Sequence, residues 1–345
     1  MNLFGLAKGE LEQEMLSKGL PRFRGRQIYR ALYSRGMDSF ETMTDLSGEL
    51  RKDLARAYEI RRPAVASRHV SRDGTVKHLI ELEDGRNVEC VYIPELPKRH
   101  TFCLSTQVGC PLKCSFCFSG TIPFERNLTA GEILGQLLIA RAALAEPPAR
   151  SNIVFMGMGE PLLNSESVLK ALSILTDDEA FSVSPRRITV STAGMAAEIG
   201  RFAEKAPPVG LAISLHATTD ELRDRVMPIN RKHPLEELLA AARALPLPKR
   251  RRITFEYVLL GGENDTPEDA RRLAQLLRGI RAKVNLITYN PWPGSPHGRS
   301  TSEATARFLQ ILMDAGLTAS VRRSRGDDVL AACGQLANQA PVAAR

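Results

Sequence analysis

The feature that most constrains the fold is a regular alternation of strand-like and helix-like segments after residue 100. Apolar, strand-like stretches lie near residues 101–106, 152–156, 187–191, 210–215, 252–259 and 284–289. Helix-like stretches follow them near residues 129–144, 164–175, 195–205, 234–245, 266–279 and 301–315. Such alternation builds a parallel sheet with right-handed crossovers. The pattern predicts an α/β fold, a partial (β/α)6 barrel, with its active site at the carboxyl ends of the strands.

The first part of the chain follows other patterns. Residues 1–62 contain three stretches with helical periodicity, 10–18, 25–34 and 47–58, which predict a small helical domain. Within residues 63–98 the period changes to two: 75–83 and 87–93 are strand-like, and each follows an Asp-Gly turn. This segment is predicted to be a β-hairpin element that leads into the main domain, residues 99–345.

Composition excludes several classes of protein. The hydrophobic share of 43% and the charged share of 25% are ordinary for a globular chain. No apolar run reaches the roughly 18 residues that a membrane-spanning helix needs, and the N-terminus lacks the pattern of a signal peptide. A net charge of +8 suits either a polyanionic partner or a solvated basic surface. We expect a cytoplasmic protein without a membrane partner.

Three of the six cysteines, Cys110, Cys114 and Cys117, lie close together in a loop that also contains Gly109 and Pro111. Thiolates so close in sequence can converge on one metal centre. A structural zinc site takes four ligands, usually as two separated pairs. An iron–sulfur cluster takes one cysteine per iron, so three cysteines leave one iron open to a small molecule. The spacing favours the cluster, with zinc as the alternative.

Small polar residues follow several predicted strands. After strand 152–156, Gly159 allows close approach of a ligand and Glu160 offers a carboxylate for an ammonium group. Other strand ends carry Ser191, the run Ser214, Leu215 and His216, and Asn290. Each of these residues alone is more often a cap or a turn residue than a ligand. Their repetition at one rim of the barrel favours a binding site.

Taken together, these segments resemble the RlmN/Cfr family of radical S-adenosylmethionine (SAM) RNA methyltransferases. The matching stretches are residues 88–95, 103–117, 126–128, 156–161, 191–194, 213–217, 290–294 and 325–336. The resemblance implies a radical-SAM barrel, an N-terminal RNA-binding accessory domain, and methylation of adenine C2 in 23S rRNA, at the peptidyl transferase centre, and in the tRNA anticodon loop. One alternative is methylation of adenine C8, as in Cfr-type members. Another, from a different class, is a non-catalytic, zinc-stabilised RNA-binding protein.

The resemblance also implies a role for each candidate residue. Cys110, Cys114 and Cys117 hold a 4Fe–4S cluster whose fourth iron binds SAM. The implied SAM contacts are Gly159, Glu160, Ser191, Ser214, Leu215, His216 and Asn290. One SAM methylates Cys333, and a second yields the 5′-deoxyadenosyl radical that activates this methyl group for attack on C2. Glu89 is the proton acceptor, and Cys103 resolves the covalent RNA adduct through a transient disulfide with Cys333.

The implied partners are the two RNAs and an external electron donor of the flavodoxin or ferredoxin type, and we expect a monomer. Two segments depart from the family pattern. They are the loop 118–124 and the tail of twelve residues after Cys333.

Overall fold

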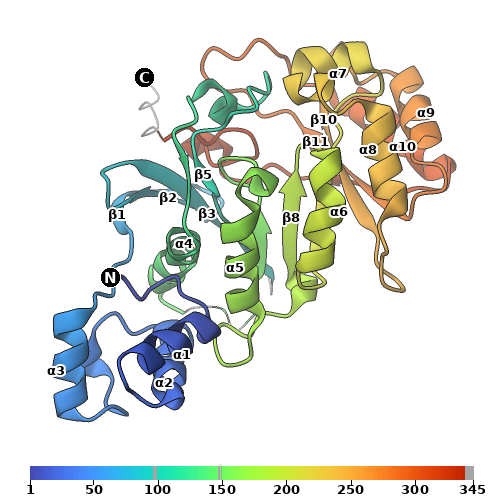
Figure 1. The fold of residues 1–345 in the computed structure, drawn as a ribbon. Helices are drawn as coiled ribbons and strands as arrows, with labels where there is room; N and C mark the ends of the chain where they lie inside the picture. The colour runs from blue at the N-terminus through green and yellow to red at the C-terminus, as the bar shows by residue number, and fades with distance from the viewer. Residues whose placement is uncertain (96–98, 147, 149, 339–345) are drawn as a thin grey trace.

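The computed structural model describes residues 1–95, 99–146, 148 and 150–338 (Figure 1). Within these residues, ten strands form one sheet in the order β1-β2-β3-β4-β7-β8-β9-β10-β11-β12. The strands from β4 to β12 pair in parallel, and β1 to β4 pair antiparallel. The parallel strands are β4 (Arg99–Cys103), β7 (Asn152–Phe155), β8 (Ile188–Thr192), β9 (Gly210–Ser214), β10 (Ile253–Leu259), β11 (Ala282–Thr288) and β12 (Thr318–Arg322).

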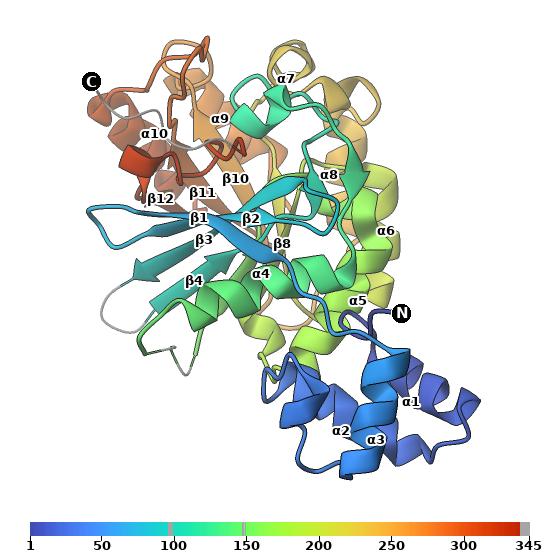
Figure 2. The same cartoon turned by 90° about the vertical axis from the view of Figure 1, so that its left-hand side faces the viewer.

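Helices connect successive parallel strands and cover the outer face of the sheet (Figures 1 and 2). They are α4 (Ala130–Ala142), α5 (Ser165–Thr176), α6 (Ala196–Lys205), α7 (Asp220–Val226), α8 (Leu235–Ala244), α9 (Pro267–Leu276) and α10 (Ser302–Asp314). The predicted α/β fold is therefore confirmed. The sequence interpretation missed β12, a short strand with no fully buried residue, and α7, which spans only two turns.

Strand β10 shows how the residue pattern builds the barrel. All of its residues are buried, because helices cover one side and the barrel interior lies on the other. Phe255 and Tyr257 join the main hydrophobic core. Glu256 and Val258 instead line a cavity inside the barrel. Alternation along the strand thus sends aromatic side chains outward and leaves Glu256 facing inward.

The N-terminal segment forms α1 (Lys8–Ser17), α2 (Arg22–Tyr33) and α3 (Gly48–Ala57). These helices lie at the end of the molecule opposite the tip of strand β8 (Figure 1). Strands β1 (Ala64–Val70), β2 (Val76–Glu81) and β3 (Asn87–Glu95) follow. β2 and β3 form the predicted hairpin, and because β3 also pairs with β4, the hairpin extends the main sheet. The domain boundaries stay predictions; the one at residue 98 and the chain end at 345 lie outside the described residues.

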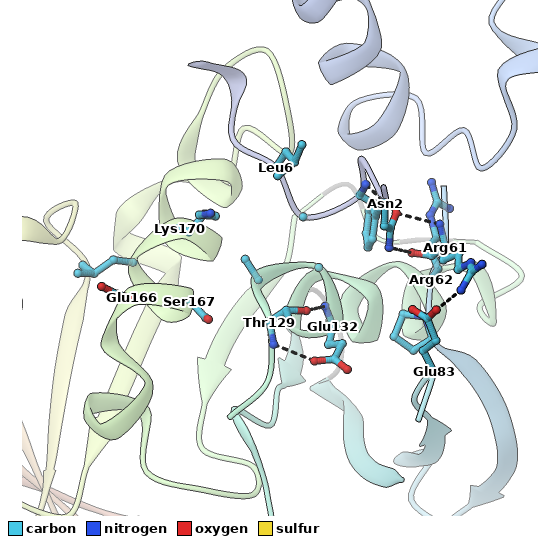
Figure 3. Close-up of a pocket in the computed structure, with 16 residues that line it drawn as sticks. Asn2, Leu6, Arg61, Arg62, Glu83, Thr129, Glu132, Glu166, Ser167 and Lys170 are labelled. Carbon is cyan, nitrogen blue, oxygen red and sulfur yellow. Dashed lines mark hydrogen bonds and ion pairs between the residues drawn. The ribbon is translucent and has the colours of Figure 1, made fainter. Parts of the chain in front are cut away.

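A groove separates the N-terminal residues from α4 and α5 (Figure 3). Two ion pairs lie at this junction: Arg61 with Glu83, and Lys170 with Glu10 at 2.7 Å. Gly5 packs against Gly131 so closely that an added Cβ would lie 2.7 Å from the Gly131 nitrogen. The groove is thus part of a tight domain junction. In the described part of the chain, no helix has the length and apolar character to cross a membrane.

Candidate active site

The loop that carries the three cysteines is closed at its base by two short strands. β5 (Gln107–Val108) pairs antiparallel with β6 (Arg126–Asn127). Inside the loop the backbone packs against itself: a Cβ on Gly109, where φ is +72°, would lie 2.0 Å from the Pro123 carbonyl oxygen. A Cβ on Gly120 would lie 2.7 Å from the Cys114 carbonyl oxygen. The loop conformation therefore depends on glycine at both positions.

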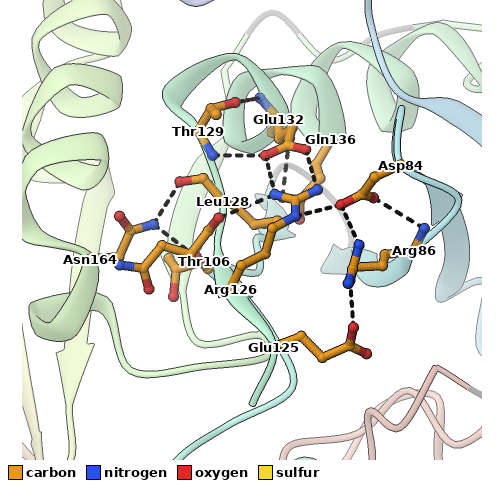
Figure 4. Close-up of polar contacts among 11 residues, drawn as sticks. Asp84, Arg86, Thr106, Glu125, Arg126, Leu128, Thr129, Glu132, Gln136 and Asn164 are labelled. Atoms are coloured by element: carbon orange, nitrogen blue, oxygen red, sulfur yellow. Dashed lines mark hydrogen bonds and ion pairs between the residues drawn. The ribbon is translucent and has the colours of Figure 1, made fainter. Parts of the chain in front are cut away.

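A polar network ties this base to its surroundings (Figure 4). Arg126 donates to Asp84 at 2.7 Å and to both carboxylate oxygens of Glu132 at 2.8 and 2.9 Å. Glu132 also accepts from the Thr129 amide and so caps α4. Asn164 donates to the carbonyl oxygens of Thr106 and Leu128. The cysteine loop is thus anchored to α4, to the turn between β2 and β3, and to the start of α5.

One cavity at the carboxyl ends of the parallel strands gathers most of the predicted site residues. The predicted residues that line it are Cys110, Cys114, Cys117, Gly159, Glu160, Ser191, Ser214, His216 and Cys333. They come from the cysteine loop, from the ends of β7, β8 and β9, and from the C-terminal segment. The strand-end pattern therefore located a shared cavity, although the assignment of each residue to a ligand stays a prediction.

The three cysteines of the loop suit a polynuclear iron–sulfur cluster. Burial raises the pKa of the Cys110 thiol to about 12, and it also raises the pKa values of Cys114 and Cys117. A cationic metal centre stabilises thiolates in such a setting. Within the described residues, no three His, Cys, Asp or Glu side chains gather around one point that a single ion would occupy. Three thiols spread around a shared cavity match the donor set of a cluster that takes one cysteine per iron.

The strand end after β7 provides a polar niche beside the cysteines. Gly159 has a φ of +96°, and a Cβ there would lie 2.5 Å from the Gln107 side chain. The buried Glu160 carboxylate accepts hydrogen bonds from the Leu162 amide at 3.0 Å and from the Ala193 amide at 2.7 Å. Burial raises the pKa of Glu160, and these amide donors oppose the shift. The fixed carboxylate retains lone pairs for an ammonium group.

The other predicted SAM contacts differ in position. His216 lines the cavity, and its Nδ1 accepts from the Val258 amide at 3.0 Å. Burial lowers the pKa of His216 to about 3, so the ring is neutral. The Leu215 side chain packs in the main core, which leaves only its backbone near the rim. Asn290 donates to the Cys333 carbonyl oxygen at 3.2 Å and accepts from Ser324. Asn290 thus holds the C-terminal segment and does not line the cavity.

The C-terminal segment brings Cys333 next to the cavity and close to Cys103. The Phe118 amide donates to the Gly334 carbonyl oxygen at 2.7 Å, and the Ser119 hydroxyl donates to the Leu336 carbonyl oxygen at 2.6 Å. Cys103, the last residue of β4, is buried in a small apolar cluster that includes Leu336. Burial, together with the charge of the nearby Cys333, raises the pKa of Cys103 to about 12. Cys103 and Cys333, which are far apart in the sequence, therefore lie near enough to interact electrostatically.

Glu89 lies beneath the C-terminal segment and does not line the cavity. Its side chain is fully buried, and Oε1 is 2.9 Å from the ammonium nitrogen of Lys77, which is also buried. Oε2 accepts from the Ala337 amide at 2.8 Å. Burial raises the pKa of Glu89, and Lys77 opposes the shift. Lys77 was missed in the sequence, where its place in an alternating strand is typical of a solvent-facing lysine.

Sequence reasoning also missed Arg223 and Glu256. The fully buried Arg223 guanidinium donates to the carbonyl oxygens of Ala193, Ser214 and Leu215, and so ties two strand ends together. Glu256 faces the cavity from the middle of β10. Arg223 lies in the charged helix α7, so nothing in the local sequence distinguishes this buried arginine from an exposed one. For Glu256, a single acid inside an apolar strand was the signal that could have been used.

Comparisons with known proteins agree with this geometry. Residues 104–277 match the model of the radical SAM superfamily, and residues 1–60 match the model described as the ribosomal RNA large subunit methyltransferase N-terminal domain. The chain is 51% identical to a dual-specificity RNA methyltransferase RlmN of Geobacter sulfurreducens, over 97% of this chain and 92% of that protein. It is 49% identical to the protein of the same name from Dinoroseobacter shibae, over 97% and 89% of the two chains.

A crystal structure of a radical SAM methyltransferase from Sphaerobacter thermophilus has the same fold. Its TM-score is 0.92 at 42% sequence identity, and the match covers 98% of this chain and 100% of that one. The family resemblance noted in the sequence is confirmed. The chain belongs to the RlmN family of radical SAM RNA methyltransferases, enzymes that use a 4Fe–4S cluster and SAM.

Proposed function

We propose that this enzyme methylates C2 of one adenine in 23S rRNA and of one adenine in the tRNA anticodon loop, through a methylated Cys333. Relatives at 49–51% identity carry the name dual-specificity RNA methyltransferase, which supports two RNA substrates. The proximity of Cys103 and Cys333 beside the cysteine-lined cavity supports the route through Cys333 most directly. A transferase that moved the methyl group from SAM straight to its substrate would need neither cysteine.

The chemistry explains why the chain needs these groups. Adenine C2 lies between two ring nitrogens and is electron-poor, so it does not attack the electrophilic methyl group of SAM. When bound, the cluster and SAM supply the radical that removes hydrogen from a methyl group. Cys333 carries that methyl group at the cavity edge. After the carbon has joined C2 and the C2 proton has gone to the proton acceptor, the Cys103 thiolate attacks the Cys333 sulfur. A disulfide forms, the sulfur–carbon bond to the RNA breaks, and the released carbon takes up a proton to become the methyl group on C2. An external reductant then restores both thiols.

The proposed role of Glu89 requires a movement of the C-terminal segment. Its Oε2 is occupied by the Ala337 amide and its Oε1 by Lys77. A proton acceptor must come within hydrogen-bond reach of the proton it removes. We therefore expect the backbone around Ala337 to withdraw from Glu89 when the target adenine enters.

The remaining assignments follow the same proposal. In the cavity, the cluster would be held by Cys110, Cys114 and Cys117. The amino group of SAM would be bound by Gly159 and Glu160. The rest of SAM would be bound by Ser191, Ser214 and His216. Leu215 would act through its backbone, and Asn290 through the Cys333 segment. The protein would act as a monomer in the cytoplasm, where its RNA substrates are made.

RNA binding by residues 1–62 is supported by one exposed aromatic residue. Phe23 is 53% exposed, and the Arg24 guanidinium lies 4.7 Å from its ring centroid. Such a pair can stack on an unpaired base. Two other arginines of helix α2 are less available for contact with RNA. Arg22 pairs with Glu12 and Arg30 with Glu179, so their charges are partly neutralised.

Nucleoside analysis tests the regiochemistry and the substrates. Mass spectrometry of 23S rRNA and tRNA from cells with and without the enzyme should show 2-methyladenosine in both RNAs only when the enzyme is present. Detection of 8-methyladenosine instead would assign the Cfr-type reaction, and methylation of one RNA alone would remove the dual specificity.

Cysteine variants test the route. Cys103→Ala should accumulate a covalent enzyme–RNA adduct, and Cys333→Ala should abolish methylation while iron content stays normal. Cys90→Ala is the matched control, because Cys90 is buried in the main core and does not line the cavity. Normal turnover by the Cys333→Ala enzyme would contradict the methyl-carrier role.

A further inference from the structure

We propose that Glu256 binds SAM, with its carboxylate Oε2 accepting a hydrogen bond from the ribose hydroxyl groups. The inference deepens the proposed function and rests on it in one respect, namely that the cavity holds SAM. Glu256 would then be a cofactor-binding residue of the barrel interior, distinct from the polar residues at the strand ends.

The position of Glu256 places its side chain among the predicted SAM contacts. On the β10 ladder, Glu256 is in register with Ser214 on β9 and with Asn285 on β11. Ser214 and Glu256 line the same cavity, together with Ser191 and His216. Only 4% of the Glu256 surface is exposed, so the carboxylate faces the cavity and not bulk water.

Hydrogen bonds fix one carboxylate oxygen and leave the other available. Asn285 Nδ2 donates to Glu256 Oε1 at 3.0 Å, and Ser320 Oγ donates to Asn285 Oδ1 at 3.3 Å. This chain across three neighbouring strands orients the carboxylate. Glu256 Oε2 is buried and has no hydrogen-bond partner among the described residues. A buried carboxylate oxygen without a donor costs free energy, which a ligand hydroxyl or amine would recover.

A positive charge near Glu256 limits the effect of burial on its carboxyl group. Burial raises the pKa of Glu256, while the positive charge of Arg322, which lines the same cavity, acts in the opposite direction. The unpartnered Oε2 of Glu256 is therefore placed to accept a hydrogen bond from an uncharged donor such as a hydroxyl group.

The choice among the donors of SAM follows from the rest of the cavity. SAM offers an ammonium group, two ribose hydroxyl groups and an adenine amine. The strand end at Gly159 and Glu160 already offers a carboxylate for the ammonium group. A carboxylate that accepts from ribose hydroxyls is a recurrent arrangement in nucleotide sites. We therefore assign the ribose to Glu256, and the adenine amine becomes the competing outcome of the test.

Binding of SAM to the anaerobically reconstituted enzyme tests the assignment without any turnover. Equilibrium dialysis would compare labelled SAM with an analogue that lacks both ribose hydroxyls, on wild type and on Glu256→Gln. The glutamine keeps the volume and the contact with Asn285 but turns an amide NH2 group toward the ligand. SAM should bind about tenfold or more weakly to Glu256→Gln, because a hydrogen bond to a charged group is lost. Removing the hydroxyls should weaken binding to wild type and have no further effect on the variant.

Controls separate the possible failures. Glu303→Gln changes an exposed glutamate at the start of α10 and should bind SAM like wild type. Glu256→Asp keeps the charge and shortens the side chain by one carbon, so it provides the same comparison if Glu256→Gln does not fold. Two outcomes would overturn the assignment and leave the proposed function intact. In one, wild type and the folded variants bind SAM equally well. In the other, removing the ribose hydroxyls weakens binding equally in wild type and in the variant. Failure of wild type to bind SAM would overturn both.

Discussion

Replacing Lys77 by methionine would isolate the energetic role of the buried ion pair beneath the Cys333 segment. The two side chains are 1% and 0% exposed, and Nζ lies 2.9 Å from Oε1 of Glu89. Methionine fills most of the lysine volume but provides no charge, so the Glu89 carboxylate keeps the Ala337 amide and loses its cation. Breaking a buried pair by removing one partner costs about 3–5 kcal/mol, because the remaining charge stays buried.

The pH dependence of this loss follows from the pKa of Glu89. Burial raises this pKa and Lys77 opposes the rise, so removal of Lys77 raises it further. Between the ordinary pKa of a glutamate and the raised value, the folded variant holds a proton that the unfolded chain releases. Stability therefore falls as the pH rises through this window. The deficit of the variant should be largest at neutral pH and should shrink in mild acid, where Glu89 becomes neutral.

Urea unfolding of wild type and Lys77→Met at neutral and mildly acidic pH would measure the effect. Lys52→Met, at an exposed position on α3, is the matched control. The double variant Lys77→Met with Glu89→Gln should recover part of the loss, because a neutral amide is less costly to bury than a charge. The reasoning fails if Lys77→Met is as stable as Lys52→Met at neutral pH, or if its deficit does not change with pH.

Three further predictions concern the hairpin and the cysteine loop. Burial lowers the pKa of His78 to about 4 from 6.5, so the unfolded chain binds a proton that the folded chain does not. Stability should fall by up to roughly 3 kcal/mol as the pH drops through that window, and His78→Leu should flatten the dependence in urea unfolding. Gly109→Ala should lower the iron bound after anaerobic reconstitution, because its Cβ would collide with the Pro123 carbonyl; Gly200→Ala, with open space around its Cβ, should not. Arg126→Ala removes the contacts with Asp84 and Glu132, so it should speed protease cleavage between residues 109 and 124. Mass spectrometry of the fragments would measure the cleavage rate. An unchanged rate would mean that the β5–β6 pairing alone holds the loop.

The sequence alone determined the features that depend on neighbouring residues. Periodicity predicted the strands and helices of the barrel, because the burial of each element repeats with its own geometry. The Cys110, Cys114 and Cys117 spacing predicted the loop that we propose holds the cluster, since ligands in one loop are close whatever the rest of the chain does. The residues after β7, β8 and β9 could be assigned to one rim, because the carboxyl ends of parallel strands meet at the same edge.

Tertiary structure alone decided which distant groups meet and which polar atoms lack partners. The approach of Cys333 to Cys103 depends on the path of the C-terminal segment over the barrel. The Lys77–Glu89 pair and the free oxygen of Glu256 depend on strand register and on what covers each strand, and these vary independently of local sequence. A lysine in an alternating strand is the same in sequence whether water or a carboxylate faces it. In the folded protein the two cases differ in stability by several kcal/mol, because a buried charge that has lost its water must be paired within the fold.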